Sequence, residues 1–116
     1  MGLENIDMTN VKKATCMFHA LGRFYANGYC QCDFTNLMNT GNLESVSQMF
    51  SFAKAAKLEL TSMDTTRTSD FSSMFNRVTV EDQIIDISSF SNKAARDIRT
   101  VFHTTNVKSI YADPLK

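Results

Sequence analysis

The chain has 116 residues with twelve basic and twelve acidic side chains, so its formal net charge is zero. This length is typical of one compact domain, here 1–116, that buries its own core without needing a metal or a disulfide. A neutral chain lacks the excess of Lys and Arg that binding along a phosphate backbone requires, which disfavours a dedicated nucleic-acid-binding domain.

Two amphipathic helices are predicted in the N-terminal half. Residues 9–27 carry apolar side chains at three- and four-residue steps, and Gly28 follows as a stop. Residues 42–57 repeat this spacing behind Asn42, which is a suitable N-cap. Phe52 falls about 100° from the centre of the second apolar stripe. It therefore needs cover from another element of the chain or from a partner.

Strands are predicted in the second half, together with a third helix. The segment 57–63 alternates like a strand, and 77–88 indicates a β-hairpin that turns at Glu81 and Asp82. A helix is expected over 91–104. The final segment, "NVKSIYAD", adds a last strand. This order favours an α+β fold with two N-terminal helices, a small and mostly antiparallel sheet of about three to four strands, and one C-terminal helix packed on it. No internal repeat is evident.

Four residues suggest a metal site. Cys16 and His19 are three apart on the polar side of the first predicted helix, and Cys30 and Cys32 share one side of the extended stretch "YCQCDF". Zinc sites use four such ligands, although Cys-x-Cys is an uncommon pair in them. The alternatives are cysteines that simply pack in the core, which we weigh more heavily, and a reactive thiol at Cys16.

Basic residues gather on two of the predicted helices. Arg96, Arg99 and His103 follow one edge of the third helix, and Lys12 and Arg23 lie on the first. These faces are candidates for contact with phosphate groups or with an acidic partner. The alternative is that they are ordinary solvated faces, since Asp97 dilutes the charge of the third helix.

No catalytic motif is recognisable, so we expect the protein not to be an enzyme. The chain has no glycine-rich phosphate loop and no carboxylate pair with an evident cleft. Nine Phe and seven Met residues suit adaptable apolar contacts. We therefore expect a small protein-binding module that uses Phe52 and the basic residues. Its size and composition also fit a viral or phage accessory factor that inhibits or modulates a host complex.

Two alternative functions stay open. The first is a nucleic-acid or nucleotide-phosphate binding protein, and the second is a zinc-binding module, zinc being the only cofactor considered. Zero net charge also favours self-association, such as a homodimer. No apolar run is long enough to span a membrane, and no signal peptide is apparent. With three cysteines, an odd number, this favours a cytoplasmic, reducing location.

Overall fold

Residues far apart along the chain pair in parallel at regular intervals. Lys13 pairs with Ser45, Ser45 with Asp70, and Asp70 with Asp97, so the offsets are 32, 25 and 27 residues. Each offset is one circuit of the chain, and the circuits stack as the coils of a solenoid. The computed structural model describes residues 6–22, 28–31 and 34–112.

The strands are short, and all of their pairings are parallel. Two sheets have two strands each: β1 (Ile6–Asp7) with β2 (Leu37–Met38), and β3 (Lys54–Ala55) with β5 (Thr79–Val80). A third sheet has the order β4 (Leu58–Glu59), β6 (Ile84–Ile87), β7 (Ser109–Ala112). Two short 3-10 turns, η1 (Phe34–Asn36) and η2 (Thr40–Asn42), flank β2.

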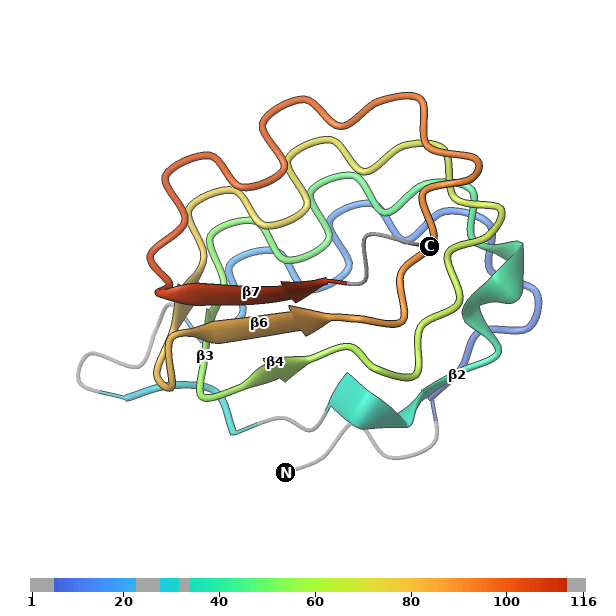
Figure 1. Ribbon diagram of the computed structural model, residues 1–116. Helices are drawn as coiled ribbons and strands as arrows, with labels where there is room; N and C mark the ends of the chain where they lie inside the picture. Colours follow the sequence, from blue (N-terminus) through green and yellow to red (C-terminus); the bar gives the residue numbers. More distant parts are fainter. Residues whose placement is uncertain (1–5, 23–27, 32–33, 113–116) are drawn as a thin grey trace.

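Each coil also contains two successive four-residue β-turns. We call these stretches the turn segments, and they cover 14–21, 46–53, 71–78 and 98–105. In the second segment the Met49 amide donates to the Val46 carbonyl at 3.0 Å, and the third residue of that turn, Gln48, has a φ of 55°. Figure 1 shows the four turn segments stacked in chain order, from blue to orange, as a layer apart from β4, β6 and β7.

Hydrogen bonds join each turn segment to the next. Amides of alternate residues in one segment donate to carbonyls of the following segment, as Phe50 does to Met74 at 2.9 Å. One phenylalanine per coil stacks along the same direction. Phe50 lies over Phe18 and Phe75 with ring centroids 5.2 and 5.9 Å apart, and Phe75 lies 5.5 Å from Phe102. The stack forms the spine of the core.

Buried hydroxyls join the coils at a second position. Thr65 donates its hydroxyl to the Ser91 carbonyl at 2.9 Å and accepts from the Ser91 amide at 2.7 Å. Thr40 makes the same pair of bonds with the backbone of Asp64. Both threonines are buried, so their hydroxyls are satisfied by the neighbouring coil rather than by water.

The three predicted helices are wrong, and the reason is geometric. In the described residues the only helical elements are the two 3-10 turns, of three residues each. Two successive four-residue turns point their first and fourth residues inward, as with Val46, Met49, Phe50 and Ala53, which are all buried. These positions are i, i+3, i+4 and i+7, the spacing of an amphipathic helix. The two folds therefore share one apolar pattern.

The antiparallel sheet and the hairpin are also wrong. Val80 of β5 pairs with Ala55, whereas Ile85 of β6 pairs with Leu58 in another sheet, so 77–88 rounds a corner of the solenoid. The α+β description fails with them, and the stacked coils show that the chain is repetitive. No helix in the described part of the chain has the length and hydropathy to cross a membrane.

Candidate functional site: the open end of the solenoid

The core is covered at one end of the stack and open at the other. In the first turn segment, Phe18 is 8% exposed and packs edge-on against Phe34 with ring centroids 5.3 Å apart. At the equivalent position of the fourth segment, Phe102 is 37% exposed, and its neighbour Ile98 is 67% exposed. We call the surface of the last coil, residues 92–112, the open end.

A groove of ≈ 550 Å³ lies along the open end. Its lining is mostly apolar and includes Phe75, Phe90, Ala95, Ile98, Val101 and Phe102. Among the described residues, the large apolar side chains that are exposed all belong to the last coil except Met17. A contiguous apolar surface of this kind is typical of a contact site.

A row of backbone amides lies along the open end. In the third turn segment, the equivalent amides donate to the fourth segment, as Phe75 does to Val101 at 2.9 Å. The fourth segment has no following coil within the described residues, so four of its amides lack an acceptor there: Ile98, Thr100, Phe102 and Thr104. The edge strand β7 likewise pairs with β6 alone in this part of the chain. The open end thus presents unused hydrogen-bond donors beside an apolar groove.

Positive charge is concentrated on the last coil. Residues 92–112 contain Lys93, Arg96, Arg99 and Lys108 but only one acidic residue, Asp97, so their formal charge is +3 and the rest of the chain carries −3. Arg99 lies 2.8 Å from the Asp97 carboxylate. The side-chain hydrogen bond from Arg99 lowers the pKa of Asp97 to about 2. The remaining cations give the open end a basic rim.

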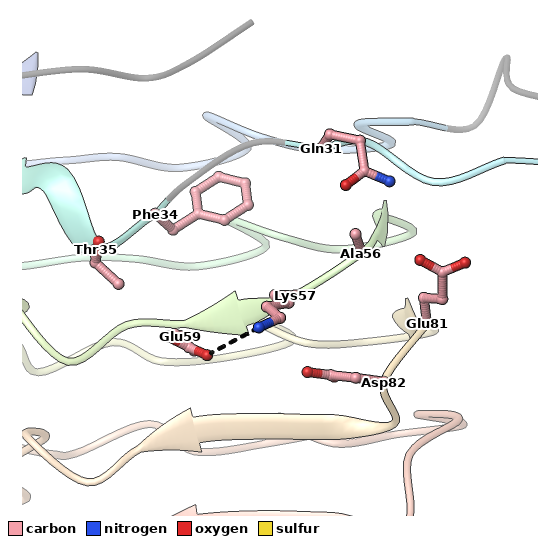
Figure 2. Close-up of a pocket in the computed structure, with 8 residues that line it drawn as sticks. All are labelled: Gln31, Phe34, Thr35, Ala56, Lys57, Glu59, Glu81 and Asp82. Carbon is pink, nitrogen blue, oxygen red and sulfur yellow. Dashed lines mark ion pairs between the residues drawn. The ribbon is translucent and has the colours of Figure 1, made fainter.

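A second cleft, of ≈ 490 Å³, is lined by polar and charged residues together with Phe34 and Ala56 (Figure 2). Figure 2 shows Asp82 reaching toward the exposed ion pair of Lys57 and Glu59, while Glu81 extends away from it. The ion pair is long, at 3.9 Å, and exposed pairs of this kind contribute little to stability. In the described residues no group of three or more His, Cys, Asp or Glu side chains could hold a metal ion.

Among the basic residues singled out from the sequence, those that the structure describes are not on helices, and they are not all together. Lys12 and Arg96 occupy equivalent positions in the first and last coils, with Glu44 and Ser69 between them. Three coil spacings of roughly 4.8 Å separate the two by about 14 Å. Arg96 shares the exposed last coil with Arg99 and His103, whereas Arg23 lies outside the described residues.

Other side chains of the same chain pack against Phe52. It sits half-buried at a left-handed position of the second turn segment, with a φ of 63°. The His19 ring packs edge-on at 5.5 Å, and the Arg77 guanidinium lies 5.6 Å from the Phe52 ring centroid. The predicted contact residue is therefore flanked by neighbouring coils.

The structure separates the members of the predicted zinc set that it describes. Cys16 is an exposed free thiol beside Gln48, and His19 is exposed against Phe52. Cys30 is buried in the core and disulfide-bonded, which differs from the free thiols that a reducing location implies. Cys32 lies outside the described residues.

The sequence reasoning missed Ile98, Phe102 and the amide row, because it assigned this stretch to a helix. The available signal was a recurring quartet with Phe at its end: "TCMF", "SQMF", "SSMF" and "RTVF". Its spacing matches the coil offsets and would have marked the repeat.

A family model described as "Mycoplasma protein of unknown function, DUF285" matches residues 24–110, which is more than half of the chain. No curated protein matches, and no solved structure matches. The match gives no support to the viral or phage accessory role expected from the sequence, nor to the role of an inhibitor.

Proposed function

The chain belongs to the DUF285 family, whose function is unknown, and from its geometry we propose that it is a non-catalytic protein-binding module that binds a partner through its open end. The observation that carries this proposal is the exposure of Ile98 and Phe102 at positions that are buried in the preceding coils. A cytoplasmic location stays a prediction of the sequence.

The energetics favour a partner at this surface. Phe102 has one face on Phe75 and leaves part of its ring in water. Burying apolar surface contributes about 25 cal/mol per Å², and aromatic side chains are enriched where binding energy concentrates. A partner that covers Ile98 and Phe102 would complete the burial that each interior coil receives from its neighbour.

The experiment compares capture by the native chain with capture by two variants. Ile98→Ser with Phe102→Ser removes the apolar surface of the open end, and Met17→Ser removes an exposed apolar residue of the first turn segment as a matched control. A protein captured from source cells, identified by mass spectrometry and then purified should bind the native chain and the control equally. Binding to the double variant should be at least tenfold weaker. Equal binding to all three would place the contact elsewhere and contradict the proposal, provided that circular dichroism shows the variants folded.

Nucleic-acid or nucleotide-phosphate binding is a second candidate, favoured by the +3 charge of the last coil. Its signature is affinity that falls steeply with salt, because each neutralised phosphate releases counterions. Binding of a labelled oligothymidylate should be measured at about 50 and 200 mM salt, the range over which a protein with several phosphate contacts loses orders of magnitude in affinity. Tight, salt-sensitive binding would favour this candidate over a protein partner.

A further inference from the structure

We infer that the partner segment bound at the open end is acidic and extended, and that it adds to the solenoid as one more layer. This inference rests on the proposed function and names the chemistry of the partner. Its carbonyl and carboxylate oxygens would accept from the amide row, and its acidic side chains would face the basic rim.

The amide row specifies acceptors. Within the solenoid, the equivalent amides of each turn segment all find carbonyl oxygens of the next coil, at 2.8–3.1 Å. At the open end the donors point to where that coil would lie. A ligand with only apolar surface would bury Phe102 but would leave these amides buried without acceptors, which is unfavourable. A polypeptide backbone supplies acceptors at a matching repeat.

The charges specify the side chains. Arg96 and Lys108 are exposed and have no ion-pair partner among the described residues, and Arg99 is engaged by Asp97. Backbone amides add their positive ends to the same surface. A segment with Asp and Glu residues complements this field, whereas a second copy docked end to end by a two-fold axis would bring two +3 surfaces together.

The edge strand specifies the extended form. β7 has one edge paired with β6 in register, with Ile85 opposite Ile110 and Asp86 opposite Tyr111. β6 itself occupies the outer edge of β4 in the same parallel manner. A strand added to an exposed sheet edge is a common mode of peptide recognition. β6 combines three isoleucines with the carboxylate of Asp86, and it is an example of a strand that adds to this sheet.

The probe is a labelled peptide with the sequence of residues 80–89, VEDQIIDISS. It carries three carboxylates and three isoleucines. Its matched control, VQNQIINISS, has the same length and apolar residues but no side-chain charge. Fluorescence anisotropy with the full chain should show at least tenfold weaker binding of the neutral peptide.

Two triple variants test the rim. Lys93→Gln with Arg96→Gln and Lys108→Gln removes the three cations of the basic rim and leaves the Arg99–Asp97 pair intact. The control removes three exposed cations elsewhere, through Lys12→Gln, Lys13→Gln and Lys57→Gln. We expect the first variant to bind the acidic peptide at least tenfold more weakly and the second to bind within twofold of the native chain. Amide shifts in two-dimensional NMR spectra should map to 98–104 and to β7.

The outcomes separate the two proposals. The inference is overturned if both peptides bind equally, if the shifts map away from the open end, or if oligothymidylate displaces the acidic peptide. If the acidic peptide does not bind but capture of a purified partner still depends on Ile98 and Phe102, the proposed function stands and only the acidic chemistry fails. If neither depends on the open end, both fail.

Discussion

Every turn segment places two non-glycine residues at positive φ. The third residues of the first turns are Cys16, Gln48, Ser73 and Thr100, and those of the second turns are Ala20, Phe52, Arg77 and Thr104. An L-residue in the left-handed region costs roughly 1–2 kcal/mol. The stacked turn segments tolerate this cost because hydrogen bonds to neighbouring coils fix the turns, on both sides in 46–53 and 71–78 and on one side in 14–21 and 98–105. Glycine should therefore be favourable at these positions.

The first prediction tests this preference for glycine at a position of positive φ. Gln48→Gly should be more stable than Gln48→Ala by about 1 kcal/mol, because only glycine escapes the left-handed penalty. At the adjacent Ser47, whose φ is not positive, glycine should be less stable than alanine by about 0.5–1 kcal/mol. Urea denaturation of the four variants measures both differences. The same sign at both positions would contradict the turn geometry.

A second prediction concerns acid. The hydrogen bond from Arg99 lowers the pKa of Asp97 from 3.8 to about 2 in the folded chain. A carboxylate whose folded pKa is depressed contributes stability above its unfolded pKa, and that contribution is lost as pH falls through the folded value. Stability should therefore fall between pH 4 and pH 2 more steeply in the native chain than in Asp97→Asn. Urea midpoints at pH 5, 3.5 and 2.5 test this, and parallel curves would refute it.

At the scale of elements, the sequence located the buried side chains better than it located the backbone. The residues placed on the stripe of 42–57, such as Val46, Met49 and Phe50, are buried. The segment type was wrong because successive four-residue turns and an α-helix repeat almost alike. The two structures differ in their hydrogen bonds, because alternate amides of a turn segment donate to another coil, whereas the amides of a helix donate along their own segment. The only sequence signal for that partner coil was the recurring quartet that ends in Phe, and the helix interpretation passed over it.

The connection between coils supplies the third prediction. Gly22 directly follows the first turn segment and has a φ of 81°, and a Cβ there would lie 2.2 Å from the Lys54 carbonyl oxygen. Gly22→Ala should destabilise the fold by about 2–4 kcal/mol, from overpacking and backbone strain together. Gly41→Ala is the matched control, because its Cβ would meet only the Asp64 carboxylate, at 3.1 Å. That side chain can move, so a loss below about 1 kcal/mol is expected. Comparable losses in urea denaturation would be inconsistent with this packing.

For the whole molecule, the consequence of stacking is that stability depends on position in the stack. Each coil contacts only its neighbours, so the interior coils are held on two faces and the last coil on one. The open end was not predicted, because it is recognised only when its residues are compared with the equivalent residues of the other coils. In the sequence, Ile98 and Phe102 fit the apolar stripe of an ordinary amphipathic helix. When the coils are aligned, they are exposed at positions where Val46 and Phe50 are buried. The zinc and basic-face hypotheses had the same origin, in an assumed helix.

The last prediction follows from this difference in stability between the interior coils and the last coil. The amides of Met49 and Val101 occupy equivalent turns, donating to carbonyls at 3.0 and 3.4 Å, but only Met49 has a coil on both sides. Local opening needs to break fewer contacts at the last coil, so the Val101 amide should exchange with deuterium faster by at least tenfold. Adding the acidic peptide should slow exchange at Val101 while leaving Met49 unchanged, because a ligand stabilises only the openings that expose its site. Uniform exchange along the stack would mean that the chain opens as one unit. The open end would then be no weaker than the interior.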